Sequence, residues 1–116
     1  MTYSSAVDDE PLSAVPEVLA LDGDLTPERF GAVSQQLESA RRSNEPLIVD
    51  LGGVRSIDGM IAMDLVLFMR RRLRHGTPFA VVVPRVNPGW ITGAGSLAGV
   101  PFCADRSEAV RLLREA

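Results

Sequence analysis

The sequence predicts a single α/β domain. Short β-rich runs alternate along the chain with segments of helical periodicity, which is the order expected when strands pair in parallel and helices connect them. The chain has 116 residues, enough to bury one hydrophobic core and not two. Its hydrophobic content of 46% and charged content of 23% are ordinary for a globular protein. We divide the chain into a polar lead-in over residues 1–16 and a domain over residues 17–116.

The first half of the domain is predicted as strand, helix, strand. Residues 18–21 form a short apolar run typical of a strand, and the lead-in could hold a further strand near residues 3–7. Gly23 is expected to turn the chain toward a helix over residues 26–42. That helix would begin with a threonine cap, a proline suited to the first turn and a glutamate that complements the dipole. Residues 47–49 are unbroken and β-rich, as in a strand covered on both faces.

The second half is predicted as helix, strand, weak helix, helix. A helix over residues 58–75 would be capped by its first residue, Asp58, and end at Gly76, with four solvated arginines near that end. Residues 79–83 read as a strand. Residues 88–99 are rich in glycine and predict a weak helix or a loop. The last helix, over residues 105–113, opens with an aspartate and a glutamate spaced as a capping box.

Charge is distributed unevenly along the chain. Residues 1–28 contain seven acids and no base, whereas residues 66–116 contain eight arginines and three acids. The formal net charge is −3 and aromatic residues are few, so we expect no nucleic-acid partner in spite of the basic second half. All twelve basic residues are arginine, so any chemistry that needs a lysine is excluded.

The sequence predicts a cytoplasmic location. The start of the chain has neither the basic nor the apolar segment of a secretory signal. No apolar run approaches the ~20 residues that span a bilayer, so we expect no membrane insertion. A single cysteine, Cys103, cannot form an internal disulfide, which fits a reducing compartment.

Two short motifs suggest enzymes, and neither is complete. Asp22 and Asp24 match the D-x-D-x-T pattern of haloacid dehalogenase-type phosphatases, but that chemistry also needs a cation for the phosphoryl group and further acids for magnesium. Gly93, Gly95 and Ala98 match a dinucleotide fingerprint, but they do not directly follow the first strand. We therefore expect a protein that is not an enzyme and has no cofactor or metal. A phosphatase using Asp22 and Asp24 with magnesium is the remote alternative.

The segment 47–60 reads L-I-V-D-L-G-G-V-R-S-I-D-G-M. It resembles the signature of STAS domains, the family of anti-sigma factor antagonists: an apolar strand, D-L-S-G-V, two variable residues, I-D and two hydroxyl residues. The segment 21–26, L-D-G-D-L-T, resembles the turn before the first helix in that family, and the similarity covers about residues 17–115. The resemblance implies a mixed sheet of four to five strands with helices packed mainly on one face.

The resemblance also implies a function. Bacterial members of this kind bind a protein partner, often an anti-sigma factor with kinase activity, and so regulate transcription. Phosphorylation of the serine after the I-D pair switches that binding off, because it adds charge to the docking surface. Here Gly59 replaces that serine and Met60 the next hydroxyl residue, so this switch is missing, although a permissive turn would also explain a glycine. Asp24 and Asp58 are expected near the contact.

The second predicted helix carries apolar residues on two sides. At about 100° per residue, one broad arc forms the core face: Ile61, Ala62, Leu65, Val66, Phe68, Met69 and Leu73. Met60, Met63 and Leu67 fall on the opposite side, where a surface helix does not need large apolar residues. An outward Met/Leu patch predicts an adaptable docking surface. The alternative is that the first helix or the loop around Trp90 covers these three side chains.

Three functions therefore remain open. The first is a regulatory binding module whose partner is an anti-sigma factor or a kinase-like regulator, with binding that is constitutive or regulated elsewhere. The second is a structural or transport-associated STAS subunit, or a scaffold that self-associates, for example as a homodimer, through the same apolar patch. The phosphatase is the third.

Overall fold

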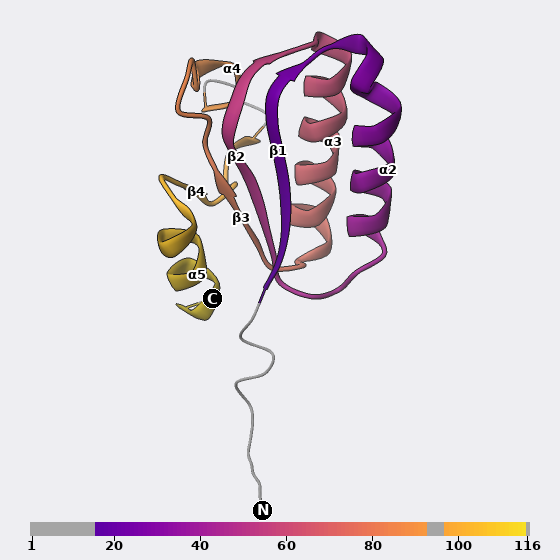
Figure 1. The fold of residues 1–116 in the computed structure, drawn as a ribbon. Coiled ribbons are helices and arrows are strands. Elements are labelled where there is room, and N and C mark those ends of the chain that lie inside the picture. The colour runs from indigo at the N-terminus through magenta and orange to yellow at the C-terminus, as the bar shows by residue number, and fades with distance from the viewer. Residues whose placement is uncertain (1–15, 93–96, 116) are drawn as a thin grey trace, which may run out of the picture.

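The structure is a computed structural model that describes residues 16–92 and 97–115. Its four strands form one sheet in the order β1-β2-β3-β4: β1 (Glu17–Leu25), β2 (Leu47–Ile57), β3 (Phe79–Val82) and β4 (Phe102–Cys103). The helical elements are η2 (Pro27–Arg29), α2 (Phe30–Arg41), α3 (Gly59–His75), α4 (Gly89–Thr92) and α5 (Arg106–Glu115). Figure 1 shows the alternation of strands and helices, and the predicted α/β fold is confirmed.

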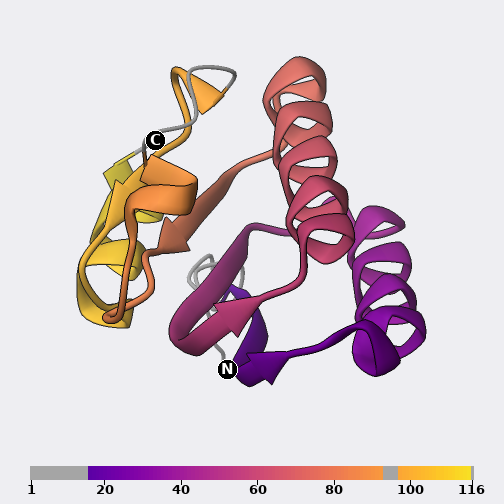
Figure 2. The same ribbon diagram turned by 90° about the horizontal axis from the view of Figure 1, so that it is seen from above.

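The sheet lies between two layers of helix. Figure 2 shows α2 and α3 side by side against one face, with α5 on the other. Along β2, Leu47 and Val49 enter the core beneath α2 and α3, whereas Ile48 joins a second cluster with the apolar side of α5. This double burial explains the unbroken apolar run in the sequence. The resemblance implied a mixed sheet, but every strand pair in the described part of the chain is parallel. The possible strand at residues 3–7 lies outside the described residues.

Both long strands run further than the sequence predicted. The expected turn at Gly23 is wrong: Gly23 lies inside β1 with φ 74°, a left-handed conformation that glycine adopts without strain. Two register shifts give β2 one extra residue each relative to β1. At the first of them a Cβ on Gly53 would lie 3.0 Å from the Cβ of Asp22, a crowded contact that glycine avoids. With these bulges, β2 extends to the residue before Asp58, and β1 ends beside that position.

The predicted helix ends are confirmed with one exception. Asp58 caps α3 through its side chain, and Gly76 ends that helix in the left-handed region with φ 71°. Asp105 accepts a hydrogen bond from the third amide along, as a capping-box residue does. Thr26 stands at the N-cap of η2, but its side chain caps no backbone amide. Its side chain instead forms a hydrogen bond with the carboxylate of Glu28, which lowers the pKa of that acid.

One of the four arginines near the end of α3 is not solvated. Arg72 is only 5% exposed, and its two Nη atoms donate to the carbonyls of Ala40, Glu45 and Pro78 at 3.3, 2.9 and 3.3 Å. Its guanidinium lies 5.9 Å from the centre of the Phe68 ring. Burial lowers its pKa, and Nε has no partner within the part of the chain that the structure describes. Arg72 thus ties together the end of α2 and the loops that precede β2 and β3.

Cys103 lies under α5, 5% exposed, with its thiol donating to the carbonyl of Val81 at 3.4 Å. Burial is the main reason that its pKa rises from 9.0 to about 11.

Because the pKa of the Cys103 thiol is higher in the folded chain than in the unfolded chain, the thiol contributes to stability at a pH below its pKa in the unfolded chain. This contribution is lost as the pH rises through its pKa in the folded chain. We expect the free energy of unfolding to fall by about 2 kcal/mol between about pH 9 and 11 through this group. Denaturant unfolding at both pH values measures the loss. An equal loss in Cys103→Ala would contradict this assignment.

Within residues 16–92 and 97–115, no helix has the length and apolar character to cross a bilayer.

Candidate partner-docking site at the start of α3

The carboxyl ends of β1 and β2 fix the position where α3 begins. The amide of Asp58 donates to the carbonyl of Leu25 at 2.8 Å, which joins the end of β1 to the strand–helix junction. The Asp58 carboxylate accepts from the amide of Met60 at 3.0 Å and so closes the first turn. Ile61 and Leu65 are fully buried beneath that turn. The start of α3 is therefore rigidly placed on the sheet.

Three large apolar side chains of α3 point away from the core. Met60, Met63 and Leu67 are 66%, 64% and 54% exposed, and we refer to them together as the α3 patch. The alternative, that α2 or the Trp90 loop covers them, does not hold in the described part of the chain. Trp90 is half-buried and packs against the main core instead. The patch is thus a free apolar surface on a well-anchored helix.

Asp24 lies at the end of β1 and is engaged by its neighbours on β2. Its carboxylate accepts from Nη2 of Arg55 at 2.9 Å and from the Ser56 hydroxyl at 2.8 Å. The Arg55 and Ser56 hydrogen bonds hold its pKa below the ordinary value. Its main-chain pairing with Ser56 places Asp24 beside the strand that leads into α3. Asp24 is therefore an ion-paired residue at the end of β1, beside the strand that leads into α3.

In the phosphatase-like motif, the carboxylate of Asp24 is engaged, whereas Asp22 contributes a main-chain contact. The carbonyl of Asp22 accepts from Arg29 at 2.8 Å, and Asp24 pairs with Arg55. Among the residues that the structure describes, no group of three or more His, Cys, Asp or Glu side chains could hold a metal ion. Of the dinucleotide-like motif, Gly93 and Gly95 lie outside the described residues.

Gly59 is the first residue of α3, and its backbone does not require glycine. Its φ is outside the left-handed region, and a Cβ built there would meet nothing within 4 Å. The explanation as a permissive turn is therefore wrong. What glycine changes at this position is chemistry: the exposed first turn of α3 offers no hydroxyl.

Gly59→Ala is expected to raise the free energy of unfolding by about 0.5 kcal/mol, because alanine loses less backbone entropy in a helix. Gly76, at the other end of α3, is the matched control. There φ is 71°, so Gly76→Ala should lower the free energy of unfolding by about 1 kcal/mol. Denaturant unfolding of both variants tests this. A Gly59→Ala chain as unstable as Gly76→Ala would show that glycine is needed at the helix start.

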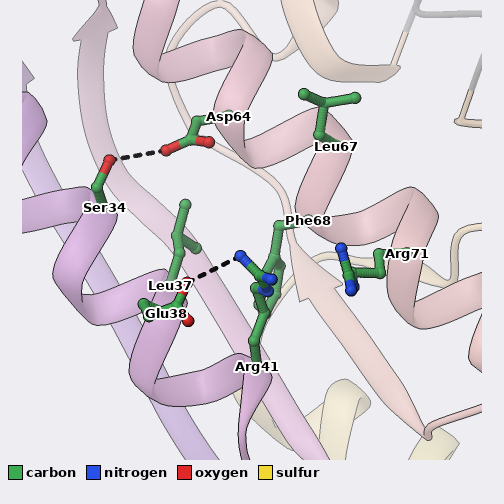
Figure 3. A pocket seen from close by; sticks show the side chains of 8 residues that line it. All are labelled: Ser34, Leu37, Glu38, Arg41, Asp64, Leu67, Phe68 and Arg71. Atoms are coloured by element: carbon green, nitrogen blue, oxygen red, sulfur yellow. Dashed lines mark hydrogen bonds and ion pairs between the residues drawn. The ribbon is translucent and has the colours of Figure 1, made fainter.

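The sequence reasoning missed a groove that runs between α2 and α3 beside the patch. It has a volume of about 270 Å³, and Figure 3 shows the side chains that line it from the two helices. Leu67 belongs to both the patch and the groove. The Ser34 hydroxyl donates to Asp64 at 2.9 Å across the two helices. Ser34, Glu38 and Arg41 recur at helical spacing, and this spacing could have indicated a polar side of α2 next to its core face.

The comparisons with known proteins agree with this architecture. No curated protein matches the chain. The family model described as "Mlab, STAS domain" matches residues 10–89, which include β1, β2, β3 and the whole of α3. That match covers more than half of the chain and includes the three residues of the α3 patch. The chain therefore belongs to the STAS-domain family.

Proposed function

We propose that this protein is a protein-binding regulatory module that docks a partner through the α3 patch and is not an enzyme. The exposure of Met60, Met63 and Leu67 on a helix anchored to the core carries the proposal. Fully burying a Leu or Met side chain contributes about 1.5–3 kcal/mol, so three such anchors supply enough for a specific contact. Methionine side chains adapt their shape to a partner surface, which suits a docking role.

The proposed partner is an anti-sigma factor or a kinase-like regulator, met in a bacterial cytoplasm, and the regulated process is transcription. Asp24, Asp58 and Gly59 would surround the apolar anchors. Gly59 takes the position of the phosphorylated serine of the family and offers no acceptor oxygen. Docking would then be constitutive, or regulated at another place on the molecule.

A second candidate uses the same surface differently. The α3 patch would be a permanent interface, either of a structural or transport-associated subunit or between two copies of this chain. The exposed area of three neighbouring apolar side chains favours it as much as it favours a transient partner. Light scattering distinguishes self-association from docking to a different protein, because Met63→Glu should dissociate a dimer that forms through the patch.

The test is an affinity pull-down from the native cytosol, comparing the wild type with Met60→Glu/Met63→Glu. The two carboxylates would have to be desolvated in the contact, so we expect at least a ~100-fold loss of one specific partner. Gln36→Glu is the control, since it also adds negative charge at an exposed helical position but faces the β1 side of α2. Retention of the same partner set by the double variant would refute docking through the patch.

A further inference from the structure

A second pocket lies at the opposite end of the helix pair, between the carboxyl-terminal ends of α2 and α3. It has a volume of about 200 Å³ and is lined by four arginines and one glutamate, a net charge of +3 with its histidine neutral. We call it the basic pocket; its charged residues are Glu38, Arg41, Arg42, Arg71 and Arg72.

The charges of the basic pocket are only partly compensated. Glu38 is shared by two guanidinium groups, at 2.8 Å from Arg41 and 3.9 Å from Arg42. Arg71 has no ion pair or hydrogen bond within the described part of the chain. Arg72 is buried and donates to backbone carbonyls, which carry no full negative charge. The pocket therefore attracts anions, and the attraction is strongest where water is partly excluded.

The described chain begins beside this pocket. The amide of Glu17 donates to the carbonyl of Pro46 at 3.0 Å, and the neighbouring carbonyl of Glu45 accepts from Arg72 at 2.9 Å. Ser43 and Asn44 of the same loop line the pocket. Figure 1 shows the same arrangement, with β1 starting at the end of the molecule where α2 and α3 finish. The segment that precedes Glu17 is therefore tethered at the end of the molecule where the basic pocket lies.

The lead-in has the charge that the pocket lacks. Asp8, Asp9 and Glu10 are consecutive acids, and no basic residue occurs before Arg29. Glu10 lies seven positions before Glu17, and at about 3.3 Å per position this gives a reach of about 23 Å. A tether of this length holds the acids at an effective concentration in the millimolar range, so a weak contact suffices. We propose that the acidic segment Asp8-Asp9-Glu10 of the lead-in binds the basic pocket of its own chain.

This contact goes beyond the docking role and does not depend on it. Arg41 and Arg71 line both the basic pocket and the α2–α3 groove that leads to Leu67. A lead-in bound there occupies the end of the groove that lies farthest from Met60 and Met63. Its test needs no partner, so its failure would leave the docking proposal unaffected.

The test is paramagnetic broadening in the full chain, with a nitroxide attached through Ser5→Cys. Cys103 is buried with a pKa of about 11, so it stays unlabelled near neutral pH. We expect the amide signals of Arg41 and Arg71 to lose more than half of their intensity, because a contact whose Kd matches a millimolar effective concentration is populated about half of the time and brings the nitroxide close to both amides. The signal of Met60 should be broadened much less than those of Arg41 and Arg71, since it lies about 17 Å further along α3 at 1.5 Å per residue.

The control is the labelled chain in which the three acids are neutralised by Asp8→Asn, Asp9→Asn and Glu10→Gln. Broadening at the pocket should then disappear, and it should also disappear in 1 M salt, which screens the charges. Unchanged broadening in the neutralised chain would overturn the proposal, because the tether alone would explain it. Absence of broadening in the unmodified sequence would overturn it equally.

Charge reversal identifies the binding partner of the acids. Arg41→Glu/Arg71→Glu replaces two exposed side chains and should abolish the broadening without unfolding the domain. The substitutions Asp8→Lys, Asp9→Lys and Glu10→Lys should restore it on that background. A mixture of nitroxide-labelled chains with isotope-labelled, nitroxide-free chains reports contacts between copies. Broadening of equal size in the mixture would overturn the intramolecular contact in favour of a second copy.

Discussion

Arg72→Met is expected to lower the free energy of unfolding by about 3 kcal/mol, which for a domain of this size is a fall in Tm of about 15 °C. Replacing a buried charge by an apolar residue is often neutral when its partner is replaced as well. Here the partners are the carbonyls of Ala40, Glu45 and Pro78, which no side-chain substitution removes. Arg72→Met leaves the Glu45 carbonyl without its donor and takes one hydrogen bond from the carbonyls of Ala40 and Pro78, which keep the amides of Ser43 and Leu47. This cost exceeds the gain from removing a desolvated guanidinium.

Thermal and urea unfolding of Arg72→Met and Arg74→Met measure the effect. Arg74 is an exposed arginine two residues further along α3, so its replacement should change the free energy of unfolding by less than about 0.5 kcal/mol. Similar stabilities for the two variants would show that the carbonyl contacts of Arg72 contribute nothing. A large loss confined to Arg72→Met would confirm that the guanidinium holds the three segments together.

Two neighbouring leucines of α3 should separate folding from docking. Leu65 is fully buried, so Leu65→Ala is expected to cost about 3 kcal/mol of unfolding free energy through lost burial and a cavity. Leu67 is 54% exposed, and Leu67→Ala should leave stability within about 0.5 kcal/mol of the wild type. If the α3 patch docks a partner, the substitution with the larger effect on affinity is the other one. Leu67→Ala should weaken the affinity for the partner about tenfold, whereas the folded fraction of Leu65→Ala should bind with nearly normal affinity.

Urea unfolding gives the stabilities, and titration with the partner recovered from the pull-down gives the affinities. A Leu67→Ala chain that binds as tightly as the wild type would remove Leu67 from the proposed contact. Loss of stability in Leu67→Ala would instead mean that its side chain is covered in solution.

The local signals in the sequence were read correctly where a few neighbouring residues decide the outcome. Helix α3 begins after Asp58 and ends at Gly76, as predicted. An N-terminal cap depends on one side chain, and a helix end in the left-handed conformation depends on one glycine. The outward position of Met60 and Met63 followed from helical periodicity alone. The STAS resemblance of the central segment is supported by the family match over residues 10–89.

Other features depend on contacts between distant segments, and the sequence reasoning missed them. The bulges that lengthen β1 and β2 arise where Gly53 packs against Asp22, a pairing that neither strand reveals alone. The sequence placed Asp24 near a partner contact but gave no sign of its ion pair with Arg55 or its hydrogen bond with Ser56. The division into a lead-in and a domain at residues 16 and 17 stays a prediction.

The amino-acid sequence by itself determined the order of the elements, the ends of α3 and the apolar side chains on its outer face. These follow from hydrophobic periodicity and from capping residues, which act over a few positions of the chain. Only the tertiary structure decided that Arg72 is buried, that α5 covers the second face of the sheet and that the chain enters beside a basic pocket. Each of these depends on contacts between segments that are distant in the sequence, such as Arg72 with the carbonyl of Glu45, 27 residues away, and packing alone brings them together.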